Sequence, residues 1–424
     1  MERVVSITSL PEKIRFPCLM WISSRLVVFG VMLVIMPLVT PTVMEKGWWD
    51  TLFAWDSGWY YKIAVEGYNY GSNFGNNLDN NQYAIAFFPL YPLLIWLLSR
   101  TGIPVVEAGL LINNLAFLFS LIFFYWWIEE FHGREVARWS TTALAWCPYS
   151  LYGSVMYTEG LFLLFSIAAL RAFERKQYIW VSIWGGLGTA TRITGVALIP
   201  AFLLTAWRQK RPIPAYAASC AIAIGICLFS LFCWFQFGDG LAFLHAQRGW
   251  RSSTGFAARG WLLMLLQVLL GGKNVTAGYI KDPDYLLQLA GVVSAAGLLV
   301  YFRHQLGQTK VRYGFWGLWL ILWLMVGNPL FQLVFIFGGL GLLIYFAPKI
   351  TLTAATYGFL SYGIALNTGL TASVDRYIYA IAPIFIAIGF LCAKYPKWGW
   401  GIICFFGLLL FLYCIRFAQD FWLA

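Results

Sequence analysis

One acidic side chain stands out because it lies among aromatic residues just beyond the first long apolar stretch. Asp56 follows Trp55 directly, and Trp55, Trp59, Tyr60 and Ile63 recur at helical spacing. This spacing predicts a helix whose aromatic side chains anchor it at the lipid interface. A carboxylate flanked by tryptophans near a membrane surface is partly desolvated, which makes Asp56 a candidate general base. The competing interpretation makes Asp56 a helix N-cap.

Three further ionisable residues interrupt apolar sequence. Glu159 falls at the expected tip of a helical hairpin, as either a solvated turn residue or a second carboxylate of the same outer cavity. Arg192 interrupts an uncharged helical pair, and such an intramembrane cation typically binds an anion or lines a cavity. A lipid phosphate is the obvious partner, because guanidinium offers bidentate donors to phosphate oxygens. Arg376, beside Asp375, is either a second phosphate ligand or a salt-bridged cap.

Polar residues of a later loop, His245 and Gln247, are weaker candidates for substrate binding, since any surface loop carries such residues. The chain has three histidines, far apart, and eight cysteines without paired spacing. We therefore expect free buried thiols, no metal site and no cofactor. A divalent cation held between Asp56 and Glu159 is compatible with the sequence but not indicated by it.

The elements that position these residues are expected to lie in a membrane. Hydrophobic residues make up 60% of the 424 positions and charged residues only 11%, against about 25% charged in a soluble domain. Apolar stretches recur from Leu19 to Ile415 without a gap that would hold a soluble domain. We expect one integral membrane domain over residues 1–424, beginning with an uncleaved helix rather than a signal peptide.

The basic residues predict an orientation for the chain. The segments 1–17, 129–138, 171–177, 208–211, 303–312, 349 and 394–397 hold 17 of the 29 Lys and Arg but only 6 of the 18 Asp and Glu. The positive-inside bias places them in the cytoplasm. The net charge of +11 is then explained by the membrane topology and indicates no nucleic-acid partner. Two large outer loops follow, over about 41–104 and 238–283.

The predicted fold is an all-α polytopic membrane protein with about twelve crossings. The segments Phe87 to Leu98 and Trp261 to Leu270 are too short to cross and are expected to lie at the outer surface. The crossings after the first helix are expected near 104–128, 139–156, 159–172, 178–190, 194–207, 213–236, 283–302, 313–327, 329–347, 351–370, 377–393 and 398–415. Tight turns are expected at 157–160 and 191–192.

Five short motifs resemble, in order, those of the PIG-V-type mannosyltransferases, a family that includes the enzyme adding the second mannose of the GPI anchor and many bacterial relatives. They are Trp55-Asp56-Ser57, Ile63-Ala64 with Gly67-Tyr68, Ala86-Phe87-Phe88-Pro89-Leu90-Tyr91-Pro92, Tyr157-Thr158-Glu159-Gly160-Leu161-Phe162, and Ala190-Thr191-Arg192-Ile193-Thr194-Gly195. The likeness covers residues 45–205 well and is weaker afterwards, where Arg376-Tyr377 and Pro383 are the main residues that resemble the family pattern.

The resemblance implies a GT-C-type glycosyltransferase that uses a polyprenyl-phosphate sugar, usually mannose, on the outer membrane face. In that fold an acidic residue of the first outer loop is the catalytic base, which carries over to Asp56. The family often has Ser within the stretch where Ile193 to Gly195 reads Ile-Thr-Gly, and a His where this chain has Gly58-Trp59. These departures from the family pattern concern the identity of the acceptor more than the type of reaction.

The expected mechanism joins these residues. Asp56 takes the proton of an acceptor hydroxyl on a glycolipid or glycan, and Arg192 with Arg376 stabilises the leaving lipid phosphate. Glu159, Trp55, Tyr60, His245 and Gln247 are the expected substrate-binding residues. The expected location is a bacterial plasma membrane with the site facing outside, or the ER membrane in a eukaryote. The rival functions are a transporter or flippase of a lipid-linked sugar or organic anion, and a silent subunit that binds a partner.

Overall fold

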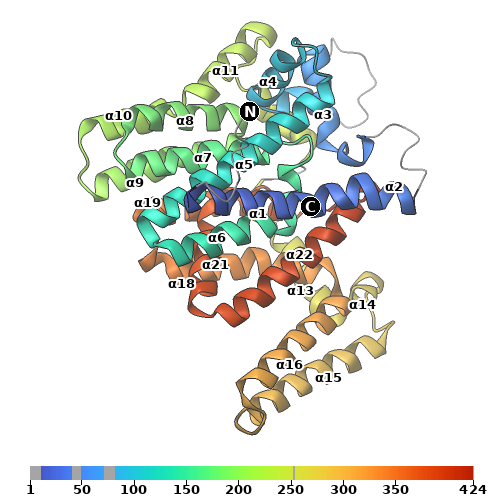
Figure 1. Ribbon diagram of the computed structural model, residues 1–424. Helices are drawn as coiled ribbons and strands as arrows, with labels where there is room; N and C mark the ends of the chain where they lie inside the picture. The colour runs from blue at the N-terminus through green and yellow to red at the C-terminus, as the bar shows by residue number, and fades with distance from the viewer. Residues whose placement is uncertain (1–10, 41–48, 71–81, 252–253, 424) are drawn as a thin grey trace, which may run out of the picture.

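The computed structural model describes residues 11–40, 49–70, 82–251 and 254–423. Within these ranges every regular element is a helix, and a single isolated bridge joins Gly255 to Thr368 (Figure 1). The all-α prediction is therefore confirmed for this part of the chain. Segments 41–48 and 71–81 of the first predicted outer loop, and 252–253 of the second, lie outside the described residues.

The helices vary widely in length. Those of the first half are α1 (Glu12–Phe29), α2 (Met36–Val39), α3 (Asp56–Glu66), α4 (Leu90–Ser99), α5 (Val105–His132), α6 (Arg134–Trp146), α7 (Glu159–Glu174), α8 (Tyr178–Thr191), α9 (Leu198–Arg208), α10 (Ile213–Ala221) and α11 (Ile224–Phe237). Those of the second half are α12 (Ala242–His245), α13 (Ala258–Leu270), α14 (Gly272–Ala277), α15 (Pro283–Tyr301), α16 (Arg303–Val326), α17 (Asn328–Leu333), α18 (Gly339–Phe346), α19 (Leu352–Leu366), α20 (Val374–Tyr379), α21 (Ala382–Lys394) and α22 (Pro396–Ala418).

Six helical stretches in the described residues are long and apolar enough to cross a membrane, which makes the chain an integral membrane protein. They are Glu12–Val39, Val105–His132, Ile213–Phe237, Pro283–Tyr301, Asn328–Lys349 and Pro396–Ala418. Shorter apolar helices accompany them at Leu90–Ser99, Ile193–Arg208, Ala258–Leu270, Leu352–Leu366 and Ala382–Lys394. The count of about twelve crossings stays a prediction.

The longest helix, α5, is the centre of the bundle, and α1, α4, α6 and α7 all pack against it (Figure 1). It begins after Pro104, and it ends at Gly133, whose φ of +85° is a conformation that glycine tolerates. At 1.5 Å per residue its 28 residues span about 42 Å, more than the apolar thickness of a bilayer. α5 therefore connects two opposite ends of the molecule.

Two breaks between helices shape one of these ends. α6 stops at Trp146, about ten residues before the predicted end of that crossing, because Pro148 favours an extended Cys147 (ψ 137°). A 3-10 turn over Pro148–Gly153 and an irregular stretch then lead to α7, which begins at Glu159. The turn predicted at 191–192 is confirmed, because Arg192 is extended between α8 and the 3-10 turn Ile193–Ala197 that leads into α9. The tight turn predicted at 157–160 is wrong, because the break between α6 and α7 extends from Cys147 to Thr158, and Glu159 and Gly160 already belong to α7.

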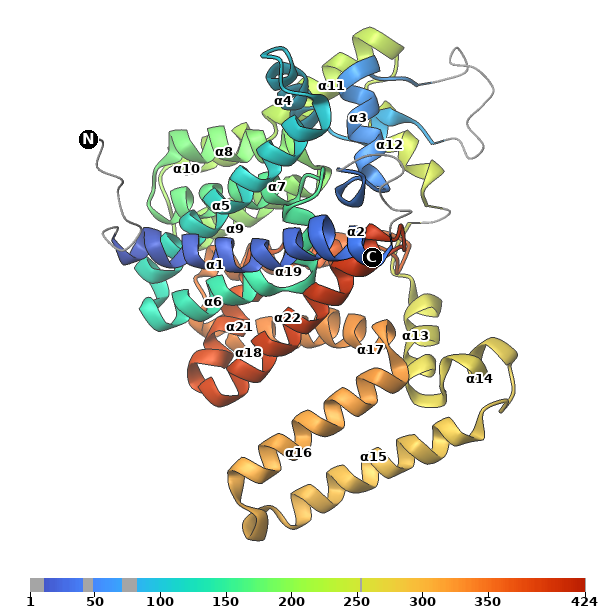
Figure 2. The same ribbon diagram turned by 45° about the vertical axis from the view of Figure 1, so that its right-hand side comes forward.

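One helical hairpin stands apart from the bundle. α15 and α16 run side by side at the edge of the molecule, with α15 the farther from the remaining helices (Figures 1 and 2). α16 is held on one side by Trp316, Trp319 and Trp323, whose rings meet aromatic rings of α22. None of the residues in the membrane-crossing window of α15 is buried inside the protein.

Candidate active site

Two carboxylates and two guanidinium groups meet in one cluster. Arg376 Nη1 lies 2.7 Å from Asp56 Oδ2, and Arg192 Nη1 lies 2.6 Å from Glu159 Oε1. Arg376 Nε also lies 3.5 Å from the same Glu159 oxygen and so connects the two pairs. The side chains are nearly enclosed, from 1% exposed for Glu159 to 17% for Asp56. We call Asp56, Glu159, Arg192 and Arg376 the charged cluster.

Helix ends place three of the four charges where the backbone favours them. Asp56 is the first residue of α3 and Glu159 the first residue of α7, so both carboxylates lie at the positive end of a helix dipole. Arg192 caps the C-terminal end of α8, which favours a cation. The local geometry therefore supports these charge states before any pairing is considered.

Unusual backbone conformations precede the two helices that carry the Asp56–Arg376 pair. Trp55, directly before α3, has φ +55°, and Ser373, directly before α20, has φ +62°. Such values cost a non-glycine residue of order 1–3 kcal/mol and occur mainly where the surrounding structure imposes them. Trp55 thus turns the chain directly before Asp56, and Ser373 does so three residues before Arg376.

Two local roles that the sequence left open for Asp56 and Arg376 are not observed. Trp55, not Asp56, is the N-cap of α3, and no side-chain capping bond is formed there. The carboxylate of Asp375 is not the partner of the neighbouring guanidinium, because its Oδ2 accepts hydrogen bonds from Tyr149 (2.6 Å) and Gln332 (2.9 Å). Burial raises the pKa of Asp375, and these hydrogen bonds oppose that effect.

Aromatic rings surround the arginines. The guanidinium carbon of Arg376 lies 5.2 Å from the ring centre of Tyr157, 5.4 Å from that of Tyr152 and 5.7 Å from that of Tyr377. Arg192 shares the Tyr377 ring at 5.4 Å. Cation–π contacts of this kind favour the charged guanidinium in a place that excludes water. The sequence motifs contain Tyr157 and Tyr377, but their role around the arginines was not predicted.

The predicted membrane-anchoring role is wrong for Tyr60 and Ile63, which are both buried within the protein. The hydroxyl of Tyr60 lies 3.3 Å from Thr158 Oγ1, one residue before Glu159. Burial, and then the charge of Asp56, raises the pKa of Tyr60, which therefore stays a neutral phenol. Trp55 is 46% exposed and meets Trp422 edge to face. α3 thus turns Tyr60 and Ile63 toward the protein, although periodicity assigned them to lipid, and leaves Trp55 exposed.

His245 and Gln247 do not contact the charged cluster. His245 Nδ1 lies 2.8 Å from Asp239 Oδ2, and Gln247 donates to the carbonyl oxygen of Ala86. Burial acts to raise the pKa of Asp239, but hydrogen bonds from His245, the Leu241 amide and Tyr70 outweigh it, so that this pKa is lowered. Both predicted residues bond within the loop that begins at Gly238 or tie it to the Ala86 backbone.

The same loop nevertheless reaches the site through two residues that sequence reasoning missed. The ring of Trp250 packs edge to face on Trp59 (5.5 Å) and on Phe87 (5.6 Å). Arg251 Nη2 lies 3.5 Å from the hydroxyl of Tyr377, the ring shared by the cluster arginines. Only their position three and four residues after Gln247 could have drawn attention to them.

No three His, Cys, Asp or Glu side chains within the described ranges are grouped so as to hold a metal ion. In the charged cluster, the carboxylate oxygens face guanidinium groups instead. One oxygen, Glu159 Oε2, is buried and has no hydrogen-bond partner in the described part of the chain. It is an acceptor available to a donor group that enters the site.

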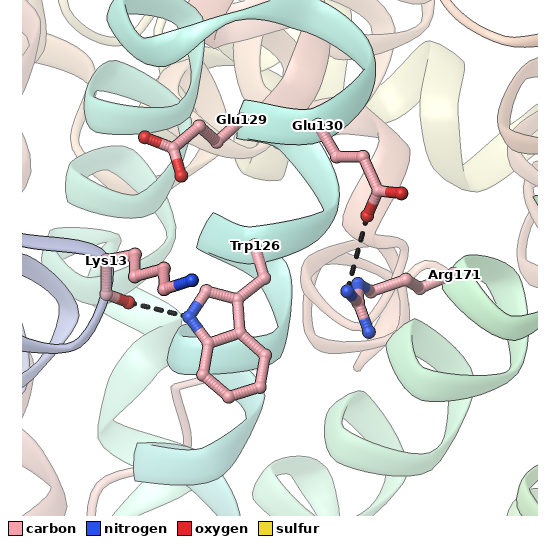
Figure 3. A pocket seen from close by; sticks show the side chains of 5 residues that line it. All are labelled: Lys13, Trp126, Glu129, Glu130 and Arg171. Atoms are coloured by element: carbon pink, nitrogen blue, oxygen red, sulfur yellow. Dashed lines mark hydrogen bonds and ion pairs between the residues drawn. The ribbon is translucent and has the colours of Figure 1, made fainter. Parts of the chain in front are cut away.

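A pocket of about 350 Å³ lies at the other end of the bundle (Figure 3). It is lined by Lys13, Trp126, Glu129, Glu130 and Arg171. Trp126 follows Asn113, which contacts the Glu159 region, by 13 residues of α5, or about 20 Å along the helix. The pocket is therefore separate from the charged cluster.

Residues 22–209, somewhat less than half of the chain, match the family model described as mannosyltransferase (PIG-V). The match includes Asp56, Glu159 and Arg192 but not Arg376. It confirms the resemblance over that part of the chain and supports glycosyltransferase as the class of enzyme. No curated protein sequence matches the chain.

Among solved structures, the chain is similar to the oligosaccharyltransferase of Archaeoglobus fulgidus. Its complex with zinc and sulfate gives 13% identity and a TM-score of 0.48 over 95% of this chain and 53% of that one. The apo form gives 12% and 0.49, covering 96% and 56%. A complex of the same enzyme, AglB, with an inhibitory peptide and a dolichol-phosphate gives 12% and 0.48, again over 96% and 56%. The chain spans about half the length of these proteins.

Proposed function

We propose that the protein is an inverting glycosyltransferase with a GT-C-type fold. It moves a sugar, most simply mannose, from a polyprenyl-phosphate donor to a hydroxyl group of a glycolipid or glycan. The observation that carries the proposal is the charged cluster, in which a carboxylate for proton transfer adjoins two guanidinium groups suited to phosphate. The match to the mannosyltransferase (PIG-V) family model supports mannose as the sugar.

In the proposed reaction, Asp56 accepts the proton of the acceptor hydroxyl while that oxygen forms a bond to the anomeric carbon. The bond from this carbon to the phosphate oxygen breaks, and the lipid phosphate leaves with the electron pair. Arg376 and Arg192 stabilise the negative charge that develops on the leaving group. A single displacement inverts the anomeric configuration, and no cofactor takes part.

The other contacts give the remaining residues roles. Glu159 holds both arginines through Oε1, and its unpaired Oε2 can accept a hydrogen bond from a sugar hydroxyl. The aromatic rings of Trp55 and Tyr60 offer faces for the sugar or the lipid tail. We assign His245 and Gln247 to the side of the substrate site that the second outer loop forms. The charge asymmetry of the loops supports a site on the non-cytoplasmic face.

The test is sugar transfer by the purified protein in nanodiscs, with polyprenyl-phosphate mannose as donor and a panel of glycolipid acceptors. Asp56→Asn keeps the size of the side chain but cannot accept the proton, so we expect a loss of about 100-fold or more in released lipid phosphate. Asp282→Asn is the matched control, because Asp282 pairs with Lys273 in the connection between α14 and α15, and it is expected to keep wild-type activity.

Two outcomes contradict the proposal. Full activity of Asp56→Asn rules out this carboxylate as the base. Absence of transfer by the wild type to every acceptor, together with movement of a lipid-linked sugar across liposome membranes, identifies a transporter instead.

A further inference from the structure

A buried arginine outside the charged cluster calls for an explanation. Arg25 lies near the midpoint of the candidate span Glu12–Val39 and is only 2% exposed. At 1.5 Å per residue, about 20 Å of helix separates it from either end of the span. No carboxylate of the described residues forms an ion pair with it. A cation at such a depth is costly and usually has a functional role.

The partners of Arg25 all belong to the segment between α6 and α7 or its immediate neighbour. Nη1 donates to the carbonyl oxygen of Ser150 (2.7 Å) and to Ser154 Oγ (2.8 Å). Nη2 donates to Ser150 Oγ (2.8 Å) and reaches the carbonyl oxygen of Ala145 (3.5 Å). The ring of Phe117 covers the guanidinium at 4.8 Å. One side chain of α1 thus holds about ten residues of a distant segment.

This segment needs donors from elsewhere, because it is not α-helical and several of its carbonyl groups have no partner within a helix. Inside a membrane protein water does not supply the missing hydrogen bonds, so side chains must do so. Asn113 donates to the carbonyl oxygens of Tyr152 and Val155, at 2.7 Å each. Asn114 donates to that of Ser154 at 2.9 Å. Arg25 supplies donors at the α6 side of the segment. Its planar guanidinium group can donate from two nitrogen atoms to two positions of the segment at once.

The segment held in this way carries groups that define the charged cluster. Tyr149 donates to Asp375, the residue before Arg376, at 2.6 Å. The rings of Tyr152 and Tyr157 flank the Arg376 guanidinium. The segment ends at Thr158, directly before Glu159. A shift of the segment would therefore move both the phosphate-facing cation and the second carboxylate.

We propose that Arg25 is a positioning residue for the charged cluster: its guanidinium fixes residues 145–154 and thereby the placement of Arg376 and Glu159. This inference rests on the proposed function for its kinetic consequence, but its structural part can be tested without it. Arg25 contacts no member of the cluster directly, and so it acts through the backbone of the segment between α6 and α7.

The kinetic test compares Arg25→Gln and Arg25→Lys in the transfer assay, with rates referred to folded, monodisperse protein. Misplacement of a catalytic group by about 1 Å can cost about 100-fold in rate, and we expect a loss of that order in kcat for Arg25→Gln. The donor KM should rise as well, because the displaced Arg376 is one of the two proposed phosphate ligands and the displaced Glu159 pairs with both of them. Arg25→Lys keeps the charge and part of the donor set, and should restore about tenfold of the loss.

The structural test is amide hydrogen exchange of the same proteins in nanodiscs. Arg25→Gln should increase exchange in peptides covering residues 147–158, while peptides covering 161–173 of α7 keep wild-type exchange. Arg171→Gln, at the far end of α7, is the control and should leave exchange of residues 147–158 and the transfer rate unchanged. Should Arg25→Gln not fold, Ser154→Ala removes one acceptor of the same guanidinium and should give a smaller change of the same kind.

Each outcome bears on the inference. Increased exchange of residues 147–158, a fall in kcat and partial rescue by lysine support it. Wild-type exchange there in Arg25→Gln, or a wild-type kcat per folded molecule, overturns it. A wild-type protein that transfers no sugar refutes the proposed function instead, and the exchange data alone then decide whether Arg25 holds the segment.

Discussion

At the scale of single residues, the four members of the charged cluster could be found from the sequence, because each interrupts apolar sequence with a charge. The pairing of these four residues could not be found from the sequence. Asp56 and Arg376 are 320 positions apart, and Arg192 and Glu159 are 33 apart. No local pattern relates such positions. The same holds for Arg25, which the sequence shows as a cation in an apolar helix but whose partners lie some 120 residues away.

The Asp56–Arg376 pair should show strong energetic coupling. Removing one partner of a buried ion pair leaves a charge without compensation and costs about 3–5 kcal/mol. We expect Asp56→Asn and Arg376→Gln each to lower the free energy of unfolding, measured by denaturant titration in detergent. The double variant should be more stable than the sum of the two losses predicts, by about 1–3 kcal/mol.

Glu159→Gln combined with Arg134→Gln serves as the uncoupled comparison, because these residues lie at opposite ends of the bundle. Their effects should add within about 0.5 kcal/mol. Additive behaviour of the Asp56 and Arg376 variants as well would contradict the pairing.

At the scale of helices, the sequence predicted most of the apolar segments, since length, hydropathy and proline positions determine them locally. Two assignments failed for a tertiary reason. Periodicity assigned Tyr60 and Ile63 to the lipid, but α3 packs this face against α4 and α5. α6 ends earlier than its apolar run because Pro148 interrupts it. Hydropathy alone does not distinguish a helix face that meets lipid from one that meets protein.

The start of α7 depends on a glycine. A Cβ atom on Gly160 would lie 2.5 Å from the carbonyl oxygen of Asn113 and 2.6 Å from its Oδ1. The Gly160 amide also donates to that Oδ1. We expect Gly160→Ala to reduce stability by about 1–3 kcal/mol through overpacking and to lower transfer by displacing Glu159, as measured by thermal unfolding and by the transfer assay.

Gly58 offers the matched control within α3, because nothing lies within 4 Å of a Cβ atom built on it. Alanine at this helix position should add about 0.5–1 kcal/mol of stability. A Gly160→Ala protein as stable as the wild type would show that α7 can move away from α5.

At the scale of the whole molecule, the helix arrangement places the charged cluster and the Figure 3 pocket at opposite ends of α5. The charge asymmetry of the sequence predicts which end faces the cytoplasm. Glu66, exposed at the end of α3, and Glu135, 71% exposed at the start of α6, are suitable reporters of the two ends.

We expect a membrane-impermeant maleimide to label Glu66→Cys in intact cells and to label Glu135→Cys only after the membrane is opened. The unmodified protein, which has eight cysteines of its own, gives the background for both. Labelling of Glu135→Cys in intact cells, with Glu66→Cys protected, would reverse the orientation and place the proposed reaction in the cytoplasm.

The charged cluster is electrically neutral as it stands, with its two carboxylates balanced by its two guanidinium groups. The proposed base is therefore occupied until an anion competes for Arg376. A donor phosphate that binds this arginine would release Asp56 and so make it available to the acceptor. The proposed function then implies a compulsory order of addition, donor before acceptor. In steady-state kinetics, a donor analogue should inhibit competitively against the donor, and an acceptor analogue uncompetitively against it.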